Sequence, residues 1–230
     1  MNGGGGTMLF HAIIGSPLGP ILLAAEEAGL AGLYFTDQRD CPRVAGLEAT
    51  VAIVSDPSAG RQSGRPIRLF KAQRSADGSS GDLFTSGAPT PPDARPSADL
   101  GLPRLLQGDM PSEARRILRQ AQHELQEYWQ GDRRAFDVPL SPRGTGFQQK
   151  VWAALLAVPF GSTLSYGELG ERAGLGAGHG RAVGTAVGSN PISIIIPCHR
   201  ILARNRTLNG YGGGLPRKVR LLQLEGFEIR

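Results

Sequence analysis

A long stretch of unusual composition, from Gly60 to Pro103, divides this 230-residue chain into two parts. It is rich in Ser, Gly, Pro, Asp and Arg, and its apolar residues, such as Leu69 and Phe70, are scattered. A compact domain rarely contains so long a connection without regular structure. We therefore expect a disordered or weakly ordered insertion at 60–103. A solvated linker without a chemical role is the favoured interpretation, and contact of its arginines with DNA phosphates is the alternative.

Short strands and one helix are predicted on the two sides of this insertion. Apolar runs separated by turn-forming residues favour an antiparallel meander. The runs are Leu9 to Ile14, Ile21 to Ala25 and Leu30 to Phe35. Beyond the insertion, apolar residues recur at helical spacing up to Tyr128, with Ser112 as the expected N-cap and Gly131 as the expected stop. Residues 1–141 are thus predicted to form a small α/β domain.

Residues 142–230 have a denser apolar pattern, which is typical of a second, mostly helical domain. Helices are expected at Phe147 to Val158, Tyr166 to Ala173, Arg181 to about Gly188 and from about Pro216. Ser165 is the expected cap of the second of these. Two short helices across a glycine-rich turn form the outline of a helix-turn-helix, although unrelated helical hairpins share it. The apolar run Ile192 to Ile196 is predicted to be a strand.

Composition narrows the class of protein. The formal charge of +5 and the isoelectric point near 9.7 suit nucleic-acid binding, but many soluble proteins reach the same values. Cys41 and Cys198 are too few for a disulfide framework and lack zinc-type spacing, so we expect no metal and no cofactor. The opening residues do not resemble a signal peptide, and no apolar run approaches the about 20 residues that span a bilayer. A reduced, cytoplasmic monomer without membrane association is predicted.

Cys198 is the candidate reactive residue. It follows a buried-looking apolar run and is directly followed by His199 and Arg200. A thiol becomes a strong nucleophile as the thiolate, and neighbouring histidine or cationic groups favour that form. A reactive thiol is therefore the favoured interpretation of Cys198, and a structural cysteine beside a surface histidine is the alternative. Cys41 has no such neighbours and is expected to be inert.

The segment Gly188 to Arg200, with the sequence GSNPISIIIPCHR, resembles the signature of the O6-alkylguanine-DNA alkyltransferases, also called methylated-DNA–protein-cysteine methyltransferases. Five flanking motifs agree in order: Phe147-Gln148 with Val151-Trp152, Ser165 to Leu169, Arg181 to Gly184, Asn209 to Gly214, and Leu221 to Gly226. The resemblance runs nearly continuously from about Pro142 to the C-terminus and is weaker at Ser16 to Gly19 and Gly32 to Phe35. The insertion at 60–103 has no expected counterpart in a compact member.

The resemblance implies a role for each matching residue. Cys198 would accept the alkyl group from O6-alkylguanine, and by extension from O4-alkylthymine. His199 would act as its base through a bound water, and Glu225 would orient His199. Tyr166 would protonate the leaving guanine, and Asn190 would brace the active-site turn.

The resemblance also implies how double-stranded DNA would be bound. The O6 atom lies inside the duplex, so the nucleotide must be flipped out before a cysteine reaches it. The second helix of the helix-turn-helix would enter the minor groove, where Arg181 would fill the vacated space and Ala182 and Gly184 would allow close approach. Tyr211 would line the base pocket. Arg200 and Lys218 are also expected to contact the DNA.

The implied fold is a small ribonuclease H-like α/β domain followed by a mostly helical, winged-helix-like DNA-binding domain. Two other functions are weighed against alkyl transfer. A non-catalytic module that binds alkylated DNA is disfavoured because its known relatives lack the acceptor cysteine, which Cys198 supplies here. A helix-turn-helix regulator with a structural thiol has no need for the pair formed by His199 and Glu225.

Overall fold

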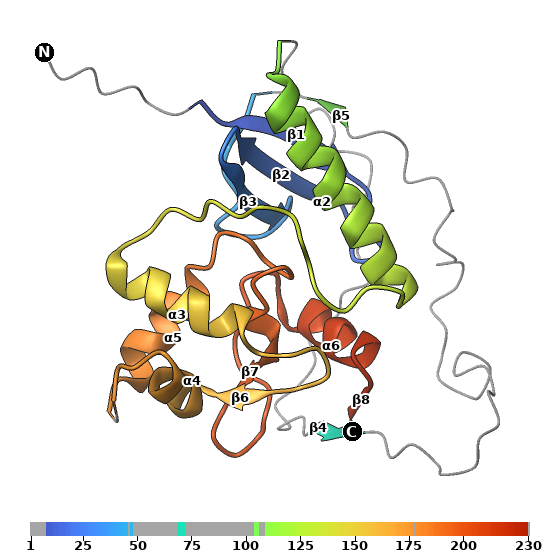
Figure 1. The fold of residues 1–230 in the computed structure, drawn as a ribbon. Helices are drawn as coiled ribbons and strands as arrows, with labels where there is room; N and C mark the ends of the chain where they lie inside the picture. Colours follow the sequence, from blue (N-terminus) through green and yellow to red (C-terminus); the bar gives the residue numbers. More distant parts are fainter. Residues whose placement is uncertain are drawn as a thin grey trace, which may run out of the picture.

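An antiparallel sheet crossed by one long helix forms the N-terminal part of the computed structural model (Figure 1). The structure describes residues 8–45, 47, 69–71, 104–105, 109–176 and 178–229. The sheet has the order β3-β2-β1-β5. Its strands are β1 (Phe10–Ile14), β2 (Ile21–Glu26), β3 (Gly29–Phe35) and β5 (Arg104–Leu105). The three strands predicted as a meander are confirmed, because β1 pairs with β2 and β2 pairs with β3, both antiparallel.

Helix α2 (Ser112–Gln130) packs its apolar face on this sheet. Gly131 ends it in the left-handed conformation, with φ of 84°, as predicted from the sequence. The predicted cap at the other end is wrong. Ser112 is already helical, the N-cap position is Pro111, and no side chain makes a capping hydrogen bond there.

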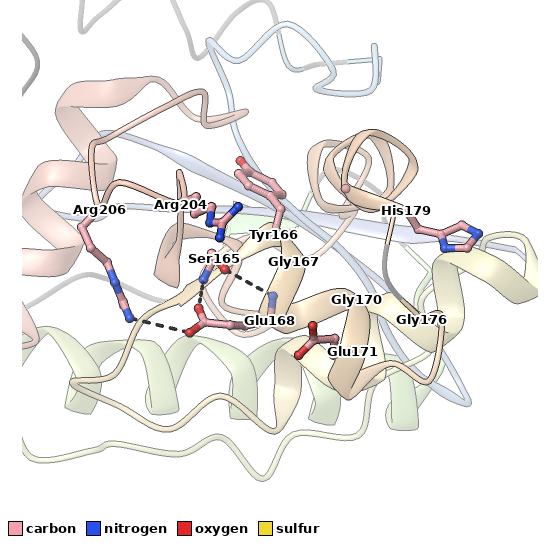
Figure 2. A pocket seen from close by; sticks show the side chains of 12 residues that line it. Ser165, Tyr166, Gly167, Glu168, Gly170, Glu171, Gly176, His179, Arg204 and Arg206 are labelled. Atoms are coloured by element: carbon pink, nitrogen blue, oxygen red, sulfur yellow. Dashed lines mark hydrogen bonds and ion pairs between the residues drawn. The ribbon is translucent and has the colours of Figure 1, made fainter.

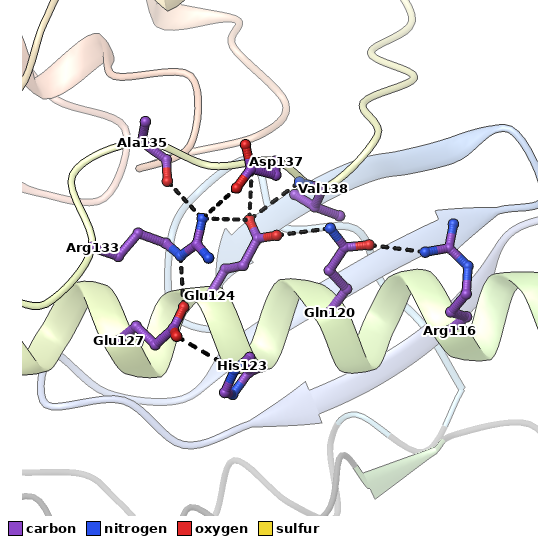
Figure 3. Close-up of polar contacts among 9 residues, drawn as sticks. All are labelled: Arg116, Gln120, His123, Glu124, Glu127, Arg133, Ala135, Asp137 and Val138. Carbon is purple, nitrogen blue, oxygen red and sulfur yellow. Dashed lines mark hydrogen bonds and ion pairs between the residues drawn. The ribbon is translucent and has the colours of Figure 1, made fainter.

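A polar network fixes the chain where it leaves α2 (Figure 3). The buried carboxylate of Glu124 accepts hydrogen bonds from the backbone amides of Asp137 (2.9 Å) and Val138 (3.2 Å). Arg133 donates to Glu127 (2.7 Å) and to Asp137 (2.8 Å). A buried carboxylate is stable only when its oxygens are hydrogen-bonded. The network therefore fixes the conformation of the segment that leads from α2 into the C-terminal part.

The insertion expected at 60–103 lies largely outside the described residues. Within it the structure describes strand β4 (Leu69–Lys71), which pairs antiparallel with β8 (Phe227–Ile229) near the C-terminus. Leu69–Lys71 thus form one short regular element within the predicted insertion, and its other residues lie outside the described part of the chain. Apolar residues that are scattered in the sequence can still supply one short strand when a partner edge is available.

The C-terminal part is mostly helical (Figure 1). Its elements are α3 (Gly146–Leu156), β6 (Leu164–Ser165), α4 (Tyr166–Arg172), α5 (Gly180–Gly188), the 3₁₀ helix η1 (Cys198–Arg200), β7 (Ile201–Leu202) and α6 (Leu215–Leu224). Ser165 caps α4 in a capping box with Glu168, which confirms the predicted cap. Thr145 and Gln148 form a second capping box at the start of α3. The helix pair α4 and α5 stands where the helix-turn-helix was predicted.

The run Ile192 to Ile196 is a buried turn, and the strand predicted there is wrong. Ile194 has φ of 71°, a left-handed conformation that no strand residue adopts. Only Ile192 forms a bridge with a strand, to Leu33 of β3. The continuous apolar pattern reflects burial on all sides, which a tight turn inside the core produces as readily as a buried strand.

One continuous hydrophobic core joins the two parts of the chain. It includes Leu23 and Phe35 from the sheet, Leu125 from α2 and Trp152 from α3. The backbone bridge between β3 and Ile192 brings the N-terminal sheet against the turn that precedes Cys198. The sheet therefore supports the segment that carries the candidate reactive thiol.

Candidate active site around Cys198

Cys198 begins η1 and is held there by the side chain of Asn190. The amide nitrogen of Asn190 donates to the carbonyl of Ile196 (2.8 Å) and to Sγ of Cys198 (3.1 Å), while its oxygen accepts from the amide of Ile192 (3.0 Å). Asn190 is buried. Because one buried side chain satisfies groups on both sides of the turn, it fixes the position of the sulfur. This geometry fits the bracing role expected of Asn190.

His199, the next residue, is fully buried and directed to Glu225 at the end of α6. Its Nε2 lies 2.9 Å from Oε1 of Glu225. Glu225 is ionised at neutral pH, so Nε2 carries the proton and donates it to the carboxylate. Nδ1 then holds the free lone pair, and this atom has no hydrogen-bond partner in the described part of the chain. Burial lowers the pKa of His199, which keeps the ring neutral and able to accept a proton.

The carboxylate of Glu225 is saturated with donors. Arg200 contacts it in a bidentate manner, with Nε 2.9 Å from Oε2 and Nη2 2.8 Å from Oε1. The amide of Gly161 donates to Oε2 (3.1 Å), and the hydroxyl of Tyr128 donates to Oε1 (3.0 Å). Burial alone would raise the pKa of Glu225, but the hydrogen bond from His199 and the hydrogen bonds and charge of Arg200 lower it to about 2.

The thiol of Cys198 is protonated at rest. Burial raises its pKa, against the opposing hydrogen bond from Asn190 and the charge of Lys218. The sequence argument expected neighbouring cations to dominate, and here burial outweighs them. A thiol of this kind needs a base at the moment of reaction, and His199 is the adjacent candidate.

The structure corrects two predicted DNA contacts. Lys218 is fully buried, and its ammonium donates to the carbonyls of Ile201 (2.5 Å) and Asn209 (3.0 Å). Burial lowers the pKa of Lys218 to about 8. Arg200 is also buried and is held by Glu225 and by the carbonyl of Val158 (2.6 Å). Neither cation is available to a DNA phosphate, because each is enclosed and already paired inside the protein.

A cavity of about 350 Å³ opens onto the sulfur. Its walls include Cys198, Asn190 and Gly212 from the C-terminal part, and Tyr34 and Asp40 from β3 and the segment that follows it. The sequence did not predict that Tyr34 and Asp40 line this cavity, because no local pattern connects them with Cys198.

The two tyrosines expected at the site, Tyr166 and Tyr211, lie in different segments, and the one at Tyr211 has a tight glycine position. A Cβ on Gly213 would come within 2.7 Å of the ring of Tyr211 and 2.8 Å of the ring of Phe35. The hydroxyl of Tyr211 is buried and has no hydrogen-bond partner in the described residues.

Tyr166 begins α4 and is partly buried, and burial raises its pKa, so its hydroxyl keeps its proton near neutral pH. Tyr166 can therefore act as a proton donor.

The residues expected to enter DNA lie on one helix. Arg181 and Ala182 are exposed in the first turn of α5, and Gly184, one turn on, packs against the ring of Tyr166. A second cavity of about 480 Å³ lies beside this helix (Figure 2). It is lined by residues of α4 and the glycine-rich turn, among them Tyr166 and His179, and by Arg204 and Arg206, which follow β7. It contains no thiol, so the cavity at Cys198 is the better candidate for the chemistry.

Comparison with known proteins places this geometry in a family. A family model, 6-O-methylguanine DNA methyltransferase, DNA binding domain, matches residues 146–227. A methylated-DNA–protein-cysteine methyltransferase of Mycobacterium tuberculosis is 53% identical over 102 residues, which are 44% of this chain and 61% of that protein. The crystal structure of M. tuberculosis O6-methylguanine methyltransferase is 31% identical, with a TM-score of 0.59, over 95% of this chain and 93% of that one. This chain belongs to the methylated-DNA–protein-cysteine methyltransferase family.

A second solved methyltransferase structure, that of M. tuberculosis OGT in complex with DNA, is 30% identical and has a TM-score of 0.55. The match covers 93% of this chain and 91% of the chain in that structure. By sequence, the chain spans about three fifths of the length of the mycobacterial methyltransferases it matches. The region matched by the family model contains Cys198, His199 and Glu225, whereas Tyr128 lies outside it. Among the described residues, no helix combines the length and apolarity needed to cross a membrane.

Proposed function

We propose that this chain repairs alkylated DNA directly, by moving an alkyl group from O6 of guanine, or from O4 of thymine, onto Sγ of Cys198. The observation that carries the proposal is a buried thiol at a small cavity, followed directly in the chain by a neutral histidine that is hydrogen-bonded to an ionised carboxylate. The membership of the methyltransferase family supports it further. The direct test is the mass that the protein gains on exposure to methylated DNA.

In the proposed reaction, His199 takes the thiol proton through a water molecule that joins Nδ1 to Sγ. The thiolate attacks the alkyl carbon, a carbon–sulfur bond forms, and the bond from that carbon to O6 breaks. The bonding electrons pass to the guanine. The resulting imidazolium is stabilised by Glu225, whose carboxylate lies 2.9 Å from Nε2.

Tyr166 then protonates the guanine that leaves, and the phenolate regains a proton from the imidazolium through solvent. Protons therefore balance, since the thiol hydrogen ends on the guanine. The product is a thioether on Cys198, which is a poor leaving group for water. We therefore propose that each molecule reacts once, without a cofactor.

The proposed partner is double-stranded DNA, approached through the minor groove by α5 of a monomer in the cytoplasm. Exposed Arg181 and Ala182 and the small Gly184 support this orientation, because close approach to a groove floor requires small side chains. The helix pair α4 and α5 supports the winged-helix-like description of residues 142–230. The sheet with α2 supports the ribonuclease H-like description of residues 1–141.

Replacing Arg181 with alanine tests base extrusion. Single-turnover repair of an O6-methylguanine duplex should slow by about tenfold or more, because unstacking the base costs a few kcal/mol and Arg181 fills the space that it leaves. Reaction with free O6-benzylguanine should change by less than about twofold. Arg220→Ala, an exposed arginine of α6 that lines neither cavity, is the matched control. Equal losses on both substrates would show that Arg181 supports the structure instead of the extruded state.

A further inference from the structure

The hydroxyl of Tyr128 reaches the candidate catalytic carboxylate from the N-terminal part of the chain. Tyr128 lies near the end of α2, is fully buried, and donates to Oε1 of Glu225 at 3.0 Å across 97 residues of sequence. Its ring is enclosed by aromatic neighbours, with ring centroids 5.3 Å away for Trp129, 5.5 Å for Phe136 and 6.2 Å for Phe160. This packing fixes the direction in which the hydroxyl points.

The hydroxyl can act only as a donor to Glu225. Burial, and then the charge of Glu225, raise the pKa of Tyr128 well above its usual range, so the phenol keeps its proton. The oxygen that accepts this proton, Oε1, also accepts from Nε2 of His199 (2.9 Å) and from Nη2 of Arg200 (2.8 Å). Tyr128 and His199 therefore compete for the charge of a single oxygen atom.

We propose that Tyr128 is a positioning residue of the alkyl-transfer reaction, which holds Oε1 of Glu225 in place and limits how strongly that oxygen binds the proton of His199. The inference rests on the proposed function, in which His199 is the base. It also gives the N-terminal part a defined role at the site, because α2 supplies a hydrogen bond that the residues of the matched DNA-binding domain do not.

The sign of the effect follows from the charges around His199. Glu225 favours the protonated ring, whereas Arg200 and Lys218 disfavour it, and Cys198 adds a negative charge when it ionises. Tyr128 is a neutral donor to Oε1, the same oxygen that the ring contacts, and it draws charge of that oxygen away from the ring. Without that donor, Oε1 becomes more basic, holds the imidazolium more firmly and raises the pKa of His199.

The experiment measures single-turnover reaction of the full-length Tyr128→Phe protein with free O6-benzylguanine over a range of pH. Phenylalanine keeps the ring and removes only the hydroxyl. The pH at which the rate falls to half on the acid side should rise by about half a pH unit, which slows the reaction about threefold below that point. NMR titration of the His199 ring should give an upward shift of the same size, and this second readout does not depend on alkyl transfer.

Phe136→Leu is the matched control, because it loosens the packing around the Tyr128 ring and keeps the hydroxyl. It should lower stability without moving either midpoint. If Tyr128→Phe leaves both midpoints unchanged, or if Phe136→Leu moves them equally, Tyr128 is structural and the inference is wrong. If the parent protein itself transfers no alkyl group, the proposed function is wrong.

A second variant of opposite sign covers the case in which Tyr128→Phe does not fold. Introduced at position 128 alone, 3-fluorotyrosine has a more acidic phenol and is a stronger donor to Glu225. Both midpoints should then move to lower pH. A shift to higher pH, or no shift, would contradict the role assigned to the hydroxyl.

Discussion

Replacing Cys198 with serine should abolish the proposed alkyl transfer and leave the fold and DNA binding intact. The serine oxygen takes the place of a sulfur that accepts the Asn190 amide at 3.1 Å, so the hydrogen bond that braces the turn is kept. A hydroxyl has a much higher pKa than a thiol, and His199 is too weak a base to ionise it. The expected result is a stable complex with an O6-methylguanine duplex and no transfer of radiolabelled methyl to protein.

Cys41→Ser is the matched control for this experiment. Cys41 is partly buried, and burial together with the charge of Asp37 raises the pKa of its thiol. The Cys41 variant should transfer methyl at the parental rate and in the parental amount. Label found on the Cys198→Ser protein would show that another residue is the acceptor.

Replacing Glu225 with glutamine should destabilise the protein by about 3 to 5 kcal/mol at neutral pH and slow alkyl transfer by at least about a hundredfold. The change leaves the guanidinium of Arg200, which is 6% exposed, without its counter-charge, and an unpaired buried charge is costly. It also removes the charge that stabilises the His199 imidazolium. Urea denaturation measures the first effect, and single-turnover kinetics with O6-benzylguanine measure the second.

The stability effect of Glu225→Gln should depend on pH in a defined direction. The pKa of Glu225 is about 2 in the folded protein, below the about 4.3 of an unfolded glutamate. Its contribution to stability is therefore fully present above about pH 4.3 and is lost as the pH falls toward 2. The parent and the variant should converge in that range. Glu27→Gln, at an exposed turn, should match the parent throughout. A constant difference at all pH values would contradict the assigned ionisation.

Local patterns in the sequence predicted most of the elements. The three strands and the end of α2 at Gly131 follow from alternating apolar runs and from the conformational freedom of glycine. The cap at Ser165 follows from the spacing to Glu168. The strand predicted at Ile192 to Ile196 is wrong because the side chain of Asn190 satisfies the backbone there, and a turn results.

One short motif pointed to the candidate thiol, to His199 and to Asn190, and a flanking motif pointed to Glu225. The groups that support them were not predicted. Arg200 and Lys218 were expected to be available to DNA. Both are buried, and their hydrogen-bond partners, Glu225 and Ile201, are not neighbours in the sequence. Tyr128 was read only as part of an apolar helix face. A hydrogen bond across 97 residues leaves no local signature, so a single sequence cannot reveal it.

Intact-protein mass measurement after incubation with excess O6-methylguanine duplex tests the central claim most directly. The account predicts that every active molecule gains the mass of one methyl group in exchange for a proton, that peptide mapping places it on Cys198, and that repaired guanine saturates at one equivalent. Methyl on any other residue, or repeated turnover by the same molecule, would contradict the account.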